Sequence, residues 1–254
     1  MSELTQTIEF YLLSMSFGLC LFSALVNSSK TGAGFIRLLQ GLVLGCLAIL
    51  VSIFYFVDAS AMMSWTYLLL SATCIYIYVY HADTKSLAMW SAYIIQIVCF
   101  LFISYFLYEK EANLFLHFLF SAILIGITTY SMILGHYYLV VPRLSERPLL
   151  TSMEILWVAL VLKIGETCLG LSQNFSFFQE FTQLGGGYAF NWMLLAMRVL
   201  WGYVALFILS IFAWKLCRMR SIQSATGILY VMVFFVIVGE LISGYLFFKY
   251  GLFL

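Results

Sequence analysis

Eight long apolar runs, separated by short polar breaks, make up almost all of this 254-residue sequence. A helix that crosses the hydrocarbon core of a bilayer needs about 20 consecutive, mostly apolar residues, and each run is long enough. The sequence therefore predicts an all-α polytopic integral membrane protein, with a bundle of eight transmembrane helices, short loops and a single domain over residues 1–254. The predicted spans are about 8–27, 36–57, 61–81, 87–108, 112–139, 152–171, 189–214 and 222–248.

Charged residues are scarce, at 9% of the chain, against about 25% in an ordinary soluble domain. A soluble protein of this length could not cover its surface with so few charges, and a protein that binds nucleic acid needs a basic face. Both classes are therefore excluded. The chain begins MSELTQTIEF, without the basic segment that opens a secretory signal peptide, so we expect the first span to remain in the mature protein.

The basic residues outside the spans are divided unevenly between the two sides of the predicted bundle. The N-terminal side carries only Lys110 and Lys249, beside acidic residues that include Glu3 and Glu9. Because short cytoplasmic loops are enriched in Lys and Arg, both termini are predicted to lie on the non-cytoplasmic side of a bacterial inner (plasma) membrane. The basic residues of the opposite side are Lys30, Arg37, Lys85, Arg143, Arg147, Lys215, Arg218 and Arg220.

Four ionisable residues lie inside spans, far from any loop: Lys163 and Glu166 in the sixth, Arg198 in the seventh and Glu240 in the eighth. A charge at the bilayer centre costs about 2.5–3.5 kcal/mol, so such residues persist where they are paired or hydrated, and they mark functional sites. A rise of about 1.5 Å per residue places all four between the midplane and the N-terminal side. Lys163 and Glu166 are three residues apart and share one helix face.

A histidine belongs to the same layer. His117 lies a few residues into the fifth span from the N-terminal side, at the depth of the four charges. We therefore predict one buried pocket formed by His117, Lys163, Glu166, Arg198 and Glu240, bordered by Gln173 and Tyr188.

Three functions fit such a pocket, and the residues alone leave all three open. A quinone-type site needs a proton acceptor beside a hydrogen-bond donor, which His117 and a carboxylate can supply, and the chain would then be a membrane subunit of an electron-transfer or proton-coupled complex. The same charges could instead line the path of a small-solute or ion transporter. The third alternative is a structural or assembly subunit in which a buried salt-bridge network fixes the helix packing.

The other two histidines, His81 and His136, lie at the ends of the third and fifth spans on the side opposite the N-terminus. Two histidines on different helices at one depth are candidate ligands of one b-type haem or of a metal ion. His117 is about 28 Å from His136 along its helix, so a two-haem arrangement with four histidine ligands is excluded. The cysteines form no CxxC pair, so no local zinc or haem-attachment motif exists.

Lys215, Arg218 and Arg220 form a basic cluster between the last two spans. Clustered cations beside a membrane helix suit anionic lipid head groups or the acidic surface of a partner subunit. The cluster is therefore a candidate contact surface, although topology alone would also account for it.

A GxxxG pattern, Gly41 and Gly45, lies in the second span. Glycines at this spacing let two membrane helices approach closely. We expect this pair to pack inside the bundle rather than to dimerise the protein.

The layout of eight spans, with both termini on the non-cytoplasmic side, resembles that of the quinol-handling anchor subunits of bacterial oxidoreductases, such as the polysulfide reductase type. The resemblance covers topology and no residue motif. It implies a respiratory complex subunit of electron transport that lies in a lipid bilayer, binds quinone and docks other membrane or peripheral protein subunits. The sequence contains no Walker A, GxSxG or HExxH motif that would indicate another chemistry.

Overall fold

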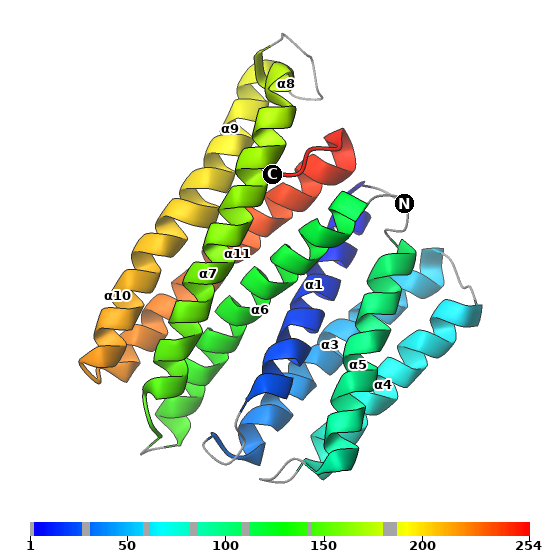
Figure 1. Cartoon of the computed structure of the whole chain (residues 1–254), viewed down its shortest axis with the longest axis vertical. Helices are drawn as coiled ribbons and strands as arrows, with labels where there is room; N and C mark the ends of the chain where they lie inside the picture. Colours follow the sequence, from blue (N-terminus) through cyan, green and yellow to red (C-terminus); the bar gives the residue numbers. More distant parts are fainter. Residues whose placement is uncertain are drawn as a thin grey trace.

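The computed structural model describes residues 3–26, 31–57, 61–81, 86–107, 112–141, 144–179 and 187–254. The regular structure of these residues is entirely helical (Figure 1). The helices are α1 (Glu3–Leu25), α3 (Ala33–Val57), α4 (Ala61–Tyr80), α5 (Leu87–Leu107), α6 (Ala112–Val140), α7 (Arg147–Gln173), α8 (Phe175–Gln179), α9 (Gly187–Val199), the π-helix η1 (Leu200–Ala205), α10 (Leu206–Arg218) and α11 (Ile222–Tyr250).

Eight helical segments of the described residues are long and apolar enough to cross a membrane, which confirms the predicted fold class. The helices α9, η1 and α10 are continuous and together make one of these segments. The outside of the bundle carries large exposed apolar side chains such as Trp65, Leu87 and Val161, which are 70%, 88% and 69% exposed. These side chains suit a surface that is solvated by lipid.

Two helix boundaries differ from the predicted spans for identifiable reasons. Helix α7 begins at Arg147, five residues before the predicted start at 152, with a proline, Pro148, in its first turn. A proline in the first turn removes no intrahelical hydrogen bond, and its fixed φ suits a helix start. Helix α10 continues to Arg218 because Lys215 and Arg218 occupy its last turn, where cations interact favourably with the helix dipole.

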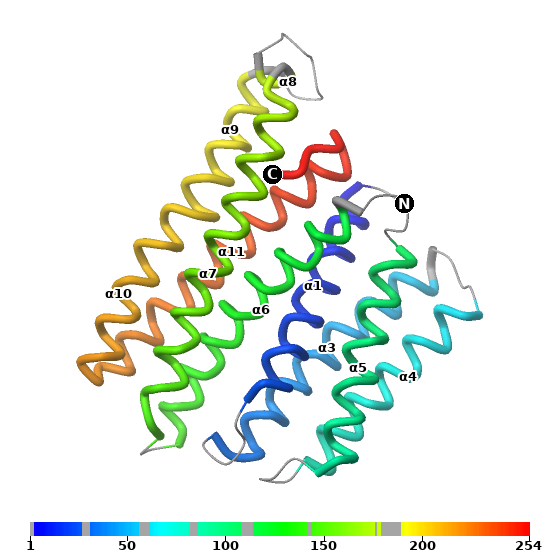
Figure 2. Tube along the Cα trace, in the orientation of Figure 1, coloured from blue at the N-terminus to red at the C-terminus, as the bar shows by residue number. Residues whose placement is uncertain are grey.

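The helices form two groups that meet where α1 packs against α6 and α11 (Figure 1). In the first group, α1 and α4 each pack against both α3 and α5. In the second group, α6 packs against α7 and α11, and α10 packs against α7 and α11. Helix α1 begins and α11 ends towards the same end of the bundle, which we call the N-terminal side (Figure 2).

Two glycines allow the close crossing of α1 and α6. A Cβ atom on Gly126 would lie 2.5 Å from the Cα atom of Gly18, so neither helix can carry a side chain at the crossing. The GxxxG pattern of α3 is not a close helix contact: a Cβ on Gly41 would meet only the Tyr78 ring, at 3.6 Å, and Gly45 is exposed with no atom within 4 Å of that position. The expectation that this pair packs inside the bundle was therefore wrong, because the pattern permits a close contact without specifying one.

Candidate functional site

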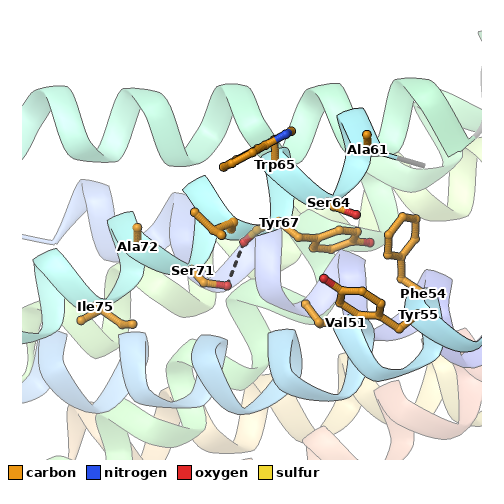
Figure 3. Close-up of a pocket in the computed structure, with 11 residues that line it drawn as sticks. Val51, Phe54, Tyr55, Ala61, Ser64, Trp65, Tyr67, Ser71, Ala72 and Ile75 are labelled. Carbon is orange, nitrogen blue, oxygen red and sulfur yellow. Dashed lines mark hydrogen bonds between the residues drawn. The ribbon is translucent and has the colours of Figure 1, made fainter. Parts of the chain in front are cut away.

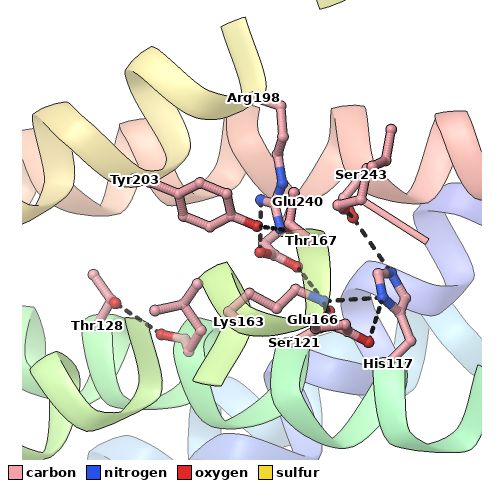
Figure 4. Close-up of polar contacts among 12 residues, drawn as sticks. His117, Ser121, Thr128, Lys163, Glu166, Thr167, Arg198, Tyr203, Glu240 and Ser243 are labelled. Atoms are coloured by element: carbon pink, nitrogen blue, oxygen red, sulfur yellow. Dashed lines mark hydrogen bonds and ion pairs between the residues drawn. The ribbon is translucent and has the colours of Figure 1, made fainter. Parts of the chain in front are cut away.

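The five ionisable residues singled out from the sequence lie together in the second helix group (Figure 4). His117 comes from α6, Lys163 and Glu166 from α7, Arg198 from α9 and Glu240 from α11. Four of them are at most 1% exposed, and Glu166 retains 12% of its side-chain exposure. The predicted convergence is therefore present, with Glu166 as its most accessible member.

The Lys163 ammonium group lies at the centre of the cluster. Its Nζ atom is 2.8 Å from Oε2 of Glu166 and 2.8 Å from the Ser121 hydroxyl oxygen. The second carboxylate, that of Glu240, lies 4.0 Å away. Because an ammonium group has three hydrogens to donate, these oxygens compensate its burial without any contact to bulk water.

Arg198 and Glu240 form the second ion pair, with 2.8 Å between Nη1 and Oε1. The guanidinium carbon also lies 4.5 Å from the centre of the Tyr203 ring, and the Tyr203 hydroxyl is hydrogen-bonded to Thr167 at 2.5 Å. The Nε and Nη2 atoms of Arg198 have no hydrogen-bond acceptor among the described residues. Buried polar atoms of this kind are commonly satisfied by ordered water.

The π-helix η1 begins two residues after Arg198 and contains Tyr203. Residues five apart point in different directions on an α-helix, and the wider turn of a π-helix changes the directions of the side chains that follow Arg198. This turn contains Gly202, which lies against Gly239 of α11: a Cβ atom on Gly239 would be 2.7 Å from the Cα of Gly202. The close approach of the two helices places the guanidinium group beside Glu240.

His117 is bonded through both of its ring nitrogens. Nδ1 lies 3.0 Å from Oε1 of Glu166 and 3.1 Å from Nζ of Lys163, and Nε2 lies 3.3 Å from the Ser243 hydroxyl oxygen. A protonated Nδ1 donates to Glu166, whereas an unprotonated Nδ1 accepts from the lysine ammonium, so it cannot serve both neighbours at once. The position of one proton therefore decides which of the two residues the imidazole binds.

Aromatic rings and the C-terminal residues cover the imidazole. The rings of Phe10, Phe247 and Phe253 have their centres 5.5, 6.1 and 5.8 Å from that of His117. The chain after α11 folds back, so that the Ser243 hydroxyl donates to the carbonyl oxygen of Leu254. These contacts exclude water from the ring on the side away from Glu166.

A pocket of about 390 Å³ opens beside the cluster, between α6 and α7. Its walls are mainly apolar, and Glu166 is the charged residue that reaches them. Gln173, predicted to border the site, lines the pocket at the end of α7, whereas the side chain of Tyr188 lies outside the described part of the chain. The other lining residues include Leu116, Phe120, Val161 and Phe253.

The two candidate haem or metal ligands have separate surroundings. His81 follows α4, is 1% exposed and packs its ring against Tyr93 of α5, with ring centres 6.5 Å apart. His136 lies on α6, is exposed and bonds through Nδ1 to the Tyr230 hydroxyl of α11 at 3.0 Å. No group of three or more His, Cys, Asp or Glu side chains suited to a metal ion occurs among the described residues.

The basic cluster between the last two membrane helices is engaged mainly within the chain. Arg218 stacks over Trp214 at 4.7 Å, and Arg220 lies 3.3 Å from Glu146, while Lys215 is exposed. A hydrogen bond from its own backbone amide, together with the charge of Arg220, lowers the pKa of the Glu146 carboxyl group. Of the three cations, Lys215 therefore makes the fewest contacts with the rest of the chain.

Sequence reasoning missed several residues of the site. Ser121, Thr167 and Ser243 each lie three or four positions from a predicted member on the same helix, so helical spacing was a usable signal. No signal was available for Tyr203, because its position depends on the π-turn. Glu9, assigned above to the N-terminal side, is buried inside the first group at 6% exposure.

No protein-family model, curated protein or solved structure matches this chain. The topological resemblance to quinol-handling subunits therefore stays a prediction.

Proposed function

We propose that this chain is the membrane subunit of an electron-transfer or proton-coupled complex, and that it binds a quinone-type head group in the pocket between α6 and α7. The observation that carries the proposal is the contact between this pocket and the buried cluster. Glu166 reaches the pocket wall and is bonded at 3.0 Å to the fully buried His117. A pocket with apolar walls and one proton-exchanging group suits a substrate that is apolar and carries protons.

The size and the walls of the pocket support this class of substrate. Its volume of about 390 Å³ falls within the roughly 300–1,000 Å³ typical of sites for small organic molecules. Leu116, Val161 and Leu169 are 49%, 69% and 65% exposed, so an apolar substrate could enter directly from the bilayer. The Gln173 amide can donate to a carbonyl oxygen, and the Glu166 carboxylate can accept from a hydroxyl group.

His117 and Glu166 would move the proton. When the Nδ1 lone pair faces Glu166, a proton that arrives on Oε1 can pass to the imidazole across their 3.0 Å contact. When Nδ1 carries hydrogen, the same contact returns a proton to the carboxylate. While the Glu166 carboxylate is ionised, its charge is compensated by Lys163, which lies 2.8 Å away. Oxidation of a quinol also releases electrons, which the proposal assigns to a redox centre of a partner subunit.

The remaining assignments follow from charge and topology. With the basic residues facing the cytoplasm, the pocket lies in the outer half of a bacterial inner (plasma) membrane, with both termini on the non-cytoplasmic side. Partner membrane or peripheral subunits would supply the redox chemistry, and the exposed Lys215 is available to an acidic partner or lipid. A b-type haem held by His81 and His136 stays a lesser proposal, which an absorption spectrum of the purified protein tests.

Replacing Glu166 with glutamine is expected to weaken binding of a short-chain ubiquinone analogue or of menaquinone at least about tenfold, because a hydrogen bond to a charged group contributes roughly 1.5–3 kcal/mol. Calorimetric titration of the detergent-solubilised protein measures the effect. Glu154→Gln is the matched control, because Glu154 lies on the same helix and is exposed. Equal quinone affinity in Glu166→Gln and the wild type, or no quinone binding by the wild type, would contradict the proposal.

A further inference from the structure

The first helix group contains a second set of buried polar residues, which the candidate site does not use. On α1 and on α4 they recur every seven residues, which is two helical turns, so on each helix they share one face. Both helices run away from the N-terminal side, and successive members lie about 10.5 Å apart along the axis. The residues are Glu9, Ser16 and Ser23 on α1, and Tyr67, Cys74 and His81 on and directly after α4.

These faces point into the centre of the group rather than to its surface. Helices α1 and α4 are each packed against both α3 and α5, so the four helices form a ring. Each of the six side chains is at most 6% exposed. We call this central row of polar groups the polar seam.

Two glutamines join the middle of the polar seam to its far end. The Gln96 amide of α5 donates to the Gln40 amide oxygen of α3 at 2.9 Å and contacts the Cys74 sulfur at 2.8 Å. Gln40 in turn donates to the Ser23 hydroxyl at 2.9 Å. Continuous side-chain contacts therefore connect α4, α5, α3 and α1. At the far end of the polar seam, the His81 ring packs against that of Tyr93.

The end of the polar seam at the N-terminal side is incompletely bonded. Glu9 forms no ion pair with any described residue, and the hydroxyl groups of Ser16 and Tyr67 have no hydrogen-bond partner there. Tyr67 also lines a groove of about 690 Å³ between α3 and α4, where Ser71 donates to its backbone carbonyl oxygen (Figure 3). Buried hydroxyl groups without a protein partner are typical positions of ordered water.

Hydrogen bonding between helices accounts for the glutamine contacts, but it does not account for the unpaired Glu9 carboxyl group or for the unsatisfied hydroxyl groups of Ser16 and Tyr67. Hydrogen bonds between membrane helices hold the helices together. An unpaired carboxyl group and unsatisfied hydroxyl groups instead cost free energy in the bilayer, and ionisable residues retained there mark proton relays. The carboxyl group of Glu9 and the imidazole of His81 also lie at opposite ends of the polar seam.

We propose that the polar seam conducts protons across the membrane, with Glu9 and His81 as the proton-exchanging groups at its two ends. A proton taken up at one end is matched by a proton released at the other, while hydroxyl groups, amides and ordered water pass it between them. The proposal does not rest on the quinone site, because α1 contacts that site through Phe10, which stacks on His117 and is not part of the polar seam.

The test is voltage-driven proton uptake by the full chain reconstituted in liposomes that contain a pH-sensitive dye, with a potassium gradient and valinomycin setting the potential. Wild-type liposomes are expected to acidify faster than protein-free liposomes. Glu9→Gln and His81→Phe should each lower the initial rate at least about tenfold, since they remove a proton-exchanging group. Glu9→Asp, which keeps the acid, should retain most of the rate.

Ser104→Ala is the matched control, because Ser104 is fully buried on α5 and its hydroxyl bonds only to carbonyl oxygens of its own helix. It should conduct like the wild type. A helical circular dichroism spectrum and a monodisperse elution profile establish that each variant is folded. The proposal would be overturned if liposomes with the wild-type protein acidified no faster than protein-free liposomes. It would also be overturned if a folded Glu9→Gln variant acidified its liposomes at the wild-type rate.

Discussion

Replacing Arg198 with methionine is expected to destabilise the protein by about 3–5 kcal/mol, because it removes one partner of a fully buried ion pair and leaves the other uncompensated. The abandoned partner is Glu240, whose remaining cation, Lys163, lies 4.0 Å away rather than at hydrogen-bonding distance. Chemical unfolding in mixed detergent micelles, followed by circular dichroism, measures the loss of free energy of unfolding.

The double variant Arg198→Met with Glu240→Met distinguishes two contributions to the free energy of unfolding. One is the destabilisation caused by a buried charge without its partner, and the other is the net stabilisation that the intact ion pair provides. It removes one positive and one negative charge, so Lys163 and Glu166 remain paired at 2.8 Å. We therefore expect it to be more stable than either single variant, as buried ion pairs replaced by apolar residues usually are. Arg220→Met, which breaks an ion pair whose arginine is 79% exposed, should change stability little. Single variants as stable as the wild type would show that this pair does not hold the second helix group together.

The second large effect is expected at the crossing of α1 and α6. Gly126→Leu should cost about 3 kcal/mol or more, because an oversized side chain in a packed interior forces backbone shifts. The obstacle at this position is main chain: a Cβ atom on Gly126 would lie 2.5 and 2.7 Å from the Cα and carbonyl carbon of Gly18, which cannot rotate away. Thermal unfolding of the purified protein, with the yield of folded monomer, measures the loss.

Gly45→Ala is the control for the glycine prediction. Gly45 lies in α3 and is exposed, and no atom lies within 4 Å of the place that an alanine methyl group would take. The change should therefore be neutral or stabilising by up to about 1 kcal/mol through helix propensity. A Gly126→Leu protein with wild-type stability would mean that the two helices can separate without loss, and that the α1–α6 contact does not join the two groups.

Much of the candidate site was predictable because helical spacing and depth are local properties. Lys163 and Glu166 are three apart, and the ion pair that this spacing predicts is present at 2.8 Å. The convergence of His117 and Glu240 on that pair was predictable from depth alone, since buried charges of opposite sign in neighbouring spans neutralise one another. The contact between Arg198 and Tyr203 was not predictable, because a π-turn changes which side chains share a face.

Glu9 and the glycines show where local reasoning fails. The sequence assigned Glu9 to the N-terminal side without placing its side chain, and α1, which begins at Glu3, buries this carboxyl group against other helices. Gly18 and Gly126 carry no motif and meet across 108 positions of sequence, whereas the GxxxG pair of α3 makes no close helix contact. Burial and close approach both depend on the partner helix, which a single segment does not contain.

The amino-acid order determined that the chain spans a membrane with eight helices and which charges are buried in them, because in hydrocarbon each helix satisfies its own backbone hydrogen bonds and needs only length and apolarity. Only the tertiary structure decided which helix faces meet. Packing between distant segments turned Glu166 towards a lipid-facing pocket, folded Phe253 over His117 and aligned the polar seam. Those outcomes arise from side-chain contacts between segments far apart in the chain, and no periodicity within one helix encodes them.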